Sequence, residues 1–179
     1  MGWIDQVPRA GNLYIGGFYA LYQTTLVESA NITHVLSVIN PSLLDMELLS
    51  SFKHYMIEVE DDPNENLLQY FEDSNRFVRE GLEQGGGVFV HCAMGKSRSA
   101  TLVIAYLMAE HHLAPSQALA QLCESRPVCD PNSGFMEQLE VYHRMLHAQT
   151  SGEKETIYKT WVKERFEGSS WEWEKRAKL

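Results

Sequence analysis

The sequence has few cysteines, a shortage of basic residues and no long hydrophobic run. Its three cysteines form no CxxC pair, which argues against a secreted disulfide framework and against a zinc site in this chain. No apolar stretch approaches the roughly 18 residues that span a bilayer, and the N-terminus lacks the pattern of a signal peptide. Lys and Arg number 15 against 24 Asp and Glu, a net charge of −9. We therefore expect neither membrane association nor direct nucleic-acid binding.

The remaining composition is that of one soluble, intracellular domain. Of the 179 residues, 44% are hydrophobic and 22% charged, which is too hydrophobic for a disordered chain. At this size a folded chain buries roughly 68–70% of its unfolded surface, so a core forms without disulfide support.

Strand patterns come early in the chain and helical patterns come late. Apolar runs predict strands at 13–15, 35–39, 55–59 and 88–91. The last run is continuously apolar, as in an inner strand covered on both faces. Helical spacing predicts helices over 21–30, 67–82, 99 to about 112, 115 to about 125, and 135–146. This order predicts an α/β sandwich.

Residues 148–179 change character. The segment Thr150-Ser151-Gly152 resembles a linker, and the rest is charged with tryptophans at 161, 171 and 173. We place a boundary between 147 and 148. Two alternatives stay open for the tail: an amphipathic helix that docks on the domain or a partner, and a partly disordered linker.

The most informative segment is HCAMGKSRS, residues 91–99. A glycine-containing loop that opens a helix can direct its N–H groups and the helix dipole at a phosphate dianion. Arg98 can grip two phosphate oxygens with its planar fork, and Gly95 permits a positive φ. The same field should lower the pKa of Cys92 and make its thiolate a nucleophile. The alternative is a buried cysteine at a strand end beside a structural arginine.

These residues resemble the signature of the protein tyrosine phosphatases, HCxxGxxRS, with every position matched, and the short chain resembles the small dual-specificity branch. The resemblance runs from about 13 to 146 and includes LYIGG at 13–17, NITHVLSV at 31–38 and PNSGFMEQL at 131–139. It implies a mixed, mostly parallel sheet of about five strands flanked by helices. Residues 1–147 would then be the catalytic domain. The phosphate-binding loop would lie between the last strand and the next helix, and comprise Ala93, Met94, Gly95, Lys96, Ser97 and Arg98.

Finer features resemble the fungal dual-specificity phosphatases that carry a C-terminal zinc-binding domain. They are NITH at 31–34, LQYF at 68–71, NRF at 75–77 and YKTW at 158–161. That resemblance implies a role in maturation of the large ribosomal subunit, pre-ribosomal partners, and a cytoplasmic and nuclear location. The Cys-rich module is absent from this chain, so we expect an excised catalytic domain, the alternative being a shorter relative. Zinc is expected only in the missing domain, and no cofactor in this one.

The resemblance also implies an acid that faces Cys92 and protonates the leaving oxygen. The acidic turn Glu60-Asp61-Asp62 follows the third predicted strand. The family's spacing to Leu67 selects Asp61, with Asp62 as the alternative.

Supporting roles follow by the same resemblance. Ser99 would hydrogen-bond the departing Cys92 thiolate, or cap the helix. His91 would shape the loop rather than act as a base. Asn132 would pin the loop, or simply cap a helix. Lys96 is expected to be solvated. Cys123 and Cys129 are expected to be ordinary thiols, although either could pair with an oxidised Cys92.

The implied reaction is hydrolysis of phosphotyrosine, phosphoserine and phosphothreonine in protein substrates through a cysteinyl-phosphate intermediate, without a metal. The chain lacks the long insertion that deepens the pocket of tyrosine-only enzymes. One alternative is a docking or assembly module in ribosome maturation whose catalysis is dispensable. Arsenate reduction or sulfur transfer on a similar loop is disfavoured, because those families lack the acidic turn and the Asn132 helix motif.

Overall fold

The computed structural model describes residues 4–178; Met1–Trp3, part of the segment analysed for a signal peptide, and Leu179 lie outside. One five-stranded sheet has the order β1-β2-β5-β3-β4. Its strands are β1 (Ile4–Gln6), β2 (Leu13–Gly17), β3 (Ile32–Val38), β4 (Lys53–Ile57) and β5 (Gly87–Cys92). Strands β2, β5, β3 and β4 run parallel to one another, and β1 is antiparallel to β2. The mixed, mostly parallel sheet is therefore confirmed.

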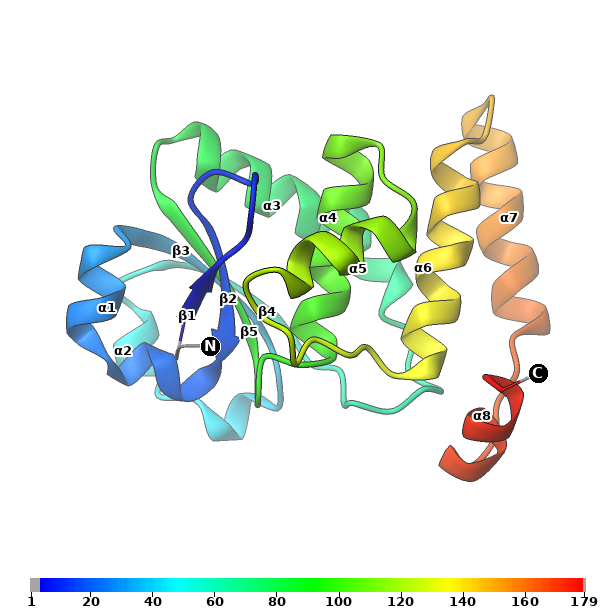
Figure 1. The fold of residues 1–179 in the computed structure, drawn as a ribbon, viewed down its shortest axis with the longest axis horizontal. Coiled ribbons are helices and arrows are strands. Elements are labelled where there is room, and N and C mark those ends of the chain that lie inside the picture. The colour runs from blue at the N-terminus through cyan, green and yellow to red at the C-terminus, as the bar shows by residue number, and fades with distance from the viewer. Residues whose placement is uncertain (1–3, 179) are drawn as a thin grey trace.

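Helices cover both faces of the sheet (Figure 1). One face packs on the 3-10 helix η1 (Phe18–Tyr22), α1 (Thr24–Ser29) and α2 (Met46–Leu49), which follows a short turn, η2 (Pro41–Leu43). The other face packs on α3 (Phe71–Glu83), preceded by η3 (Leu68–Tyr70), and on α4 (Arg98–His111). Helices α5 (Pro115–Cys123) and α6 (Ser133–Leu146) pack on α4. Because Val35 and Phe89 face the first layer while Leu36 and Val90 face the second, the central strands are apolar on both sides.

The central strand–loop–helix unit follows the predicted pattern closely. Every residue of β5 is buried, as the continuous apolar run predicts. Helix α4 is buried without interruption from Arg98 to Met108, because the sheet, α3, α5 and α6 surround it. Helix α3 ends where Gly85 adopts a φ of +78°, the left-handed conformation that commonly terminates helices.

Several elements of the structure differ from the prediction. The short edge strand β1 was not predicted, since three residues carry no readable alternation. The strand predicted at 55–59 lies at 53–57, so Glu58 and Val59 already belong to the following loop. The helix predicted over 21–30 is divided between η1 and α1 at Gln23.

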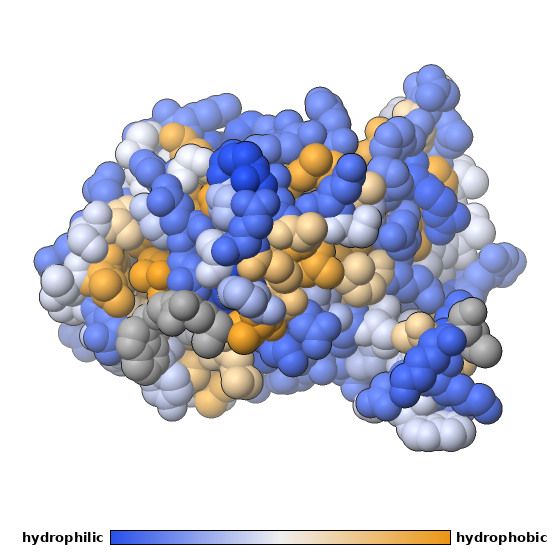
Figure 2. Space-filling model, viewed as in Figure 1, coloured by the Kyte–Doolittle hydropathy of each residue, from blue (hydrophilic) through white to orange (hydrophobic). Residues whose placement is uncertain are grey.

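The tail is helical. Helix α7 (Ser151–Glu164) packs against α6, and α8 (Ser170–Arg176) follows a short turn. The exposed fractions are 8% for Trp161 and 4% for Trp173, whereas Trp171 is 67% exposed. Figure 2 shows a mostly hydrophilic surface over these helices. The tail therefore corresponds to the first alternative, a helical segment docked on the domain, and not to a partly disordered linker. Within residues 4–178, no helix is long and apolar enough to cross a membrane.

Candidate active site

The candidate site lies where the parallel strands end. The carboxyl ends of β2, β3, β4 and β5 meet at one edge of the sheet, the usual position of a ligand site in such folds. The loop 93–97 joins Cys92, the last residue of β5, to Arg98, the first residue of α4. The acid loop, residues 58–67, follows β4 at the same edge.

Gly95 gives the phosphate loop its curl. Its φ is +67°, and a Cβ at this position would lie 2.3–2.8 Å from backbone atoms of Gly16. Both observations require glycine, for a positive φ and for a close backbone approach. The loop is further joined to the first residue of η1, directly after β2, by a hydrogen bond from the Phe18 N–H to the Ala93 carbonyl, 3.4 Å.

Cys92 is only 2% exposed at the base of this loop. Its Sγ lies 3.3 Å from the Gly95 backbone nitrogen, which donates to it, and 3.3 Å from the Ser99 Oγ. Burial opposes ionisation, but hydrogen bonds from Ser99 and from the Lys96 backbone, together with the Arg98 charge, lower the pKa of the Cys92 thiol below its ordinary value. The environment thus favours a thiolate.

Ser99 does not cap the helix. The N-cap of α4 is Ser97, while Ser99 lies inside the first turn, so the capping alternative for Ser99 is wrong. Its hydroxyl instead lies against the Cys92 sulfur, in the position that a thiolate-stabilising role requires.

The Arg98 guanidinium is buried beside the loop, its side chain 8% exposed. Nη1 donates to the Val59 carbonyl at 3.2 Å and lies 3.8 Å from the Glu60 carboxylate. Within the described part of the chain, the buried Nε of Arg98 has no hydrogen-bond partner. A buried donor of this kind is rare in folded proteins and marks a position where an acceptor from a ligand can bind.

Arg126 supports the loop from its outer side, a role that the sequence did not predict. Its Nη2 donates to the Met94 carbonyl at 2.9 Å and its Nε to the Gly95 carbonyl at 2.7 Å. A trans peptide directs its C=O and N–H to opposite sides. Holding these two carbonyls outward therefore directs the next two N–H groups, those of Gly95 and Lys96, toward Cys92. The Arg126 guanidinium also pairs with the Asp5 carboxylate of β1 at 2.6 Å.

His91 is fully buried at the end of β5. Its Nε2 lies 2.6 Å from the Ser37 Oγ, which lies 2.8 Å from the His54 Nε2, and its Nδ1 lies 3.4 Å from the Cys92 carbonyl. Burial lowers the pKa of His91 from 6.5 to about 4, so the ring is neutral near neutral pH. These contacts fit the expected loop-shaping role.

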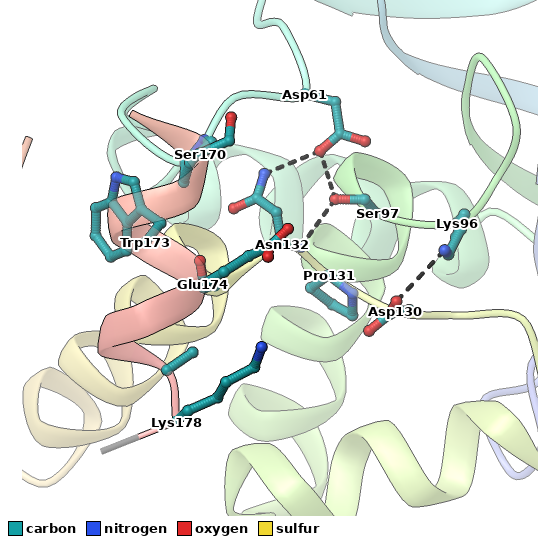
Figure 3. Close-up of a pocket in the computed structure, with 13 residues that line it drawn as sticks. Asp61, Lys96, Ser97, Asp130, Pro131, Asn132, Ser170, Trp173, Glu174 and Lys178 are labelled. Atoms are coloured by element: carbon teal, nitrogen blue, oxygen red, sulfur yellow. Dashed lines mark hydrogen bonds and ion pairs between the residues drawn. The ribbon is translucent and has the colours of Figure 1, made fainter. Parts of the chain in front are cut away.

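Asp61, Ser97 and Asn132 come together at the rim of the loop (Figure 3). The Asp61 Oδ1 accepts from the Ser97 hydroxyl at 2.6 Å and from the Asn132 Nδ2 at 2.9 Å. The Asn132 Oδ1 also accepts from the Phe135 N–H at 2.9 Å, capping α6. The two alternatives for Asn132 are therefore both present, since it caps α6 and also joins the loop to the acid. Asp62 instead accepts from the Asn64 N–H at 2.8 Å within its own turn.

Lys96 and the other two cysteines lie as the sequence suggested. Lys96 is exposed and lies 3.4 Å from the Asp130 carboxylate. Burial raises the pKa of the Cys129 thiol to about 12, and burial also raises the pKa of Cys123. Of the three thiols, Cys92 is the one whose surroundings promote ionisation.

A pocket of about 510 Å³ adjoins the acid. One side is formed by Asp61, Ser97 and Asn132, and the other by Trp173 and Glu174 of α8. Figure 3 shows α8 standing opposite the acid loop across this space. The C-terminal helix thus forms a wall of this pocket beside Asp61, a feature that no sequence motif indicated.

Residues 13–145 match the family described as dual specificity phosphatase, catalytic domain. The chain therefore belongs to this family within the protein tyrosine phosphatase superfamily, and it is a protein phosphatase. Dual specificity protein phosphatase 1 of Arabidopsis thaliana is 41% identical over 138 residues, 76% of this chain and 69% of that protein.

Within the family, the chain resembles Yvh1. It is 39% identical over 133 residues to tyrosine-protein phosphatase yvh1 of Schizosaccharomyces pombe, which is 73% of this chain but only 39% of that protein. The crystal structure of the Yvh1 phosphatase domain from Chaetomium thermophilum matches with a TM-score of 0.74 at 33% identity, over 83% of this chain and 99% of that one. The predicted family and the resemblance to the fungal enzymes are confirmed.

Proposed function

We propose that this phosphatase cleaves phosphotyrosine, phosphoserine and phosphothreonine through a cysteinyl-phosphate intermediate formed on Cys92. The observation that carries the proposal is the buried sulfur of Cys92, which faces an inward N–H and a hydroxyl. Nearby, the buried Nε of Arg98 has no hydrogen-bond partner among residues 4–178. A phosphate dianion in the loop would accept from the loop amides and from Arg98, and would place phosphorus in front of the thiolate.

In the first step, the Cys92 thiolate forms a bond to phosphorus as the ester P–O bond breaks. The leaving oxygen takes a proton from the Asp61 carboxyl group. Both hydrogen bonds from Ser97 and Asn132 go to Oδ1, so we assign Oδ2 to the leaving oxygen. In the second step, Asp61 accepts a proton from water, the water oxygen bonds to phosphorus, and the P–S bond breaks. The Ser99 hydroxyl and the Gly95 N–H stabilise the departing thiolate.

We also propose that this chemistry needs no metal ion. Transition-state charge on phosphoryl oxygens requires fixed positive potential around it. Here the loop N–H groups, the N-terminus of α4 and Arg98 supply that potential from the protein itself.

The test of the nucleophile is Cys92→Ser, with Cys123→Ser as the matched control. We expect Cys92→Ser to retain less than about 1% of wild-type turnover, because a hydroxyl is a far poorer nucleophile near neutral pH. It should keep its affinity for tungstate, an oxyanion that fills the phosphate site without a bond to sulfur, while Cys123→Ser should behave as wild type. Mass spectrometry of acid-quenched Asp61→Asn enzyme should detect a phosphoryl group on Cys92. Turnover by Cys92→Ser above that level would exclude the mechanism.

We further propose that the cellular role is in large-ribosomal-subunit biogenesis, with pre-ribosomal particles as partners and a nuclear and cytoplasmic distribution. The similarity to Yvh1 supports this role. The competing candidate is a docking module whose catalysis is dispensable. Replacing the protein in cells by its Cys92→Ser variant separates the two candidates. A lower ratio of large to small subunits in sucrose gradients would require catalysis, whereas normal profiles would favour docking.

A further inference from the structure

Asn64 joins the acid loop to the C-terminal segment. Its Nδ2 donates to the Gly168 carbonyl at 2.9 Å, and its Oδ1 accepts from the Gly168 N–H and from the Trp173 Nε1, both at 2.9 Å. Its carbonyl accepts from the Arg165 Nη1 at 3.0 Å. Four hydrogen bonds thus connect one loop residue, three positions after Asp61, to the segment 165–173.

The segment 165–173 is itself firmly held. The Trp173 ring is 4% exposed and lies edge-on to Phe166, with ring centroids 5.0 Å apart. The Arg165 guanidinium lies over the ring of Trp161, 5.7 Å from its centroid. The Trp161 Nε1 donates to the Glu137 carboxylate of α6 at 3.3 Å. Asn64 is therefore bonded to a segment that is packed on the domain.

The acid loop is also held from the side of α6. A Cβ on Gly134 would lie 2.0 Å from the Pro63 carbonyl oxygen, so Pro63 lies directly against the start of this helix. The Gln138 side chain accepts from the N–H groups of Leu67 and Leu68, both at 2.8 Å. The turn 62–65, which includes Pro63, lies between Asp61 and the Gln138 contacts, and in it the Asn64 N–H donates to the Asp62 carboxylate. Asn64 is the residue of this turn whose side chain reaches the tail.

We infer that Asn64 is a positioning residue for the general acid, and that the segment 165–173 sets the position of Asp61 through it. The inference rests on the role proposed above for Asp61. A general acid must lie within hydrogen-bond reach of the leaving oxygen, and small displacements of a catalytic group reduce the rate strongly. The segment lies beside the acid, since α8 forms the opposite wall of the pocket (Figure 3). It also lies outside residues 13–145, the part of the chain that matches the family.

The experiment compares two substrates that differ in their need for an acid. Asn64→Ala removes the side-chain bonds, and Trp173→Phe removes only the Nε1 donor while keeping a buried ring. For phenyl phosphate, which has a poor leaving group, we expect kcat/KM to fall about 10-fold in Asn64→Ala and less in Trp173→Phe. For 4-nitrophenyl phosphate, both variants should stay within about 2-fold of wild type. The control Trp171→Ala alters an exposed ring of the same helix and should change neither.

A purely structural role would have different signatures. We expect the Asp61→Asn/Asn64→Ala double variant to be no slower on phenyl phosphate than Asp61→Asn, because the two changes act through one group. Three results would each overturn the inference. In the first, the losses of kcat/KM in the two single variants add in the double variant. In the second, Asn64→Ala loses kcat/KM equally on both substrates, and in the third, Asn64→Ala has wild-type kinetics. If Asp61→Asn itself shows no dependence on the leaving group, the assignment of the acid fails, and the inference fails with it. If Asp61→Asn behaves as proposed and Asn64→Ala does not, only the inference about Asn64 fails.

Discussion

Replacing the buried His91 should reduce the acid sensitivity of the fold. In the folded chain, burial lowers the pKa of His91 from 6.5 to about 4, with the Cys92 carbonyl opposing and the His54 charge adding to the effect. Below pH 6.5 the unfolded chain binds a proton that the folded chain does not. Stability is therefore full above pH 6.5 and falls as the pH drops from 6.5 toward 4. The difference between the two pKa values corresponds to about 3 kcal/mol of unfolding free energy.

The assay is urea unfolding of wild type and His91→Asn at a series of pH values from about 7 to 4.5. We expect wild type to lose about 2 kcal/mol more than the variant over this range. The other histidines with lowered pKa values, His34 and His54, are common to both proteins. An NMR titration of wild-type His91 provides a second measurement that needs no substitution. Parallel stability curves, or a His91 ring that protonates near pH 6.5, would refute the reasoning.

Three further predictions concern the loop and the acid. Arg98→Lys keeps the charge but loses the planar fork of the guanidinium. We expect kcat/KM to fall about 100-fold and the Kd for orthovanadate to rise. If both constants stay unchanged, Arg98 does not bind the phosphoryl group. Asp61→Asn should slow phenyl phosphate by about 10²–10⁴-fold and 4-nitrophenyl phosphate much less, with loss of the basic limb of the pH–rate profile. Asp62→Asn should do little in the same series, and the reverse result would move the acid by one residue. Gly134→Ala should destabilise the fold by about 1–3 kcal/mol, because the added Cβ would meet the Pro63 carbonyl, and a thermal melt equal to wild type would show that the loop moves freely.

The centre of the fold could be predicted from the sequence because the residues that define it are contiguous in the chain. The apolar run of β5, the glycine of the loop and the apolar helix α4 are contiguous in the chain, and together they define the phosphate cradle. The assignment of Asp61 as the acid rests on the resemblance, since an acidic turn by itself is usually a solvated loop.

The supporting roles of Arg126 and Asn64 could not be predicted from the sequence, because their partners are distant in the chain and include backbone atoms. Arg126 bonds carbonyls of residues about 30 positions away, and any residue has a carbonyl, so no pattern of side chains identifies the pair. Asn64 bonds Gly168 and Trp173 across more than 100 positions. The edge strand β1 could not be predicted for another reason, because three residues are too few to show an alternating pattern.

The pairing of Arg126 with Asp5 has a consequence for how far the enzyme can be shortened. Asp5 lies in β1, upstream of residues 13–145 that match the family. A fragment trimmed to those residues would keep Cys92, Arg98 and the proposed acid Asp61. It would lose the Asp5 carboxylate that pairs with Arg126, and it would lose the partners of Asn64 near the other terminus. The N-terminal strand therefore supports the phosphate loop through Arg126, whereas the C-terminal segment holds the acid loop through Asn64. We therefore expect an enzyme trimmed to residues 13–145 to be less active than one that keeps both terminal segments.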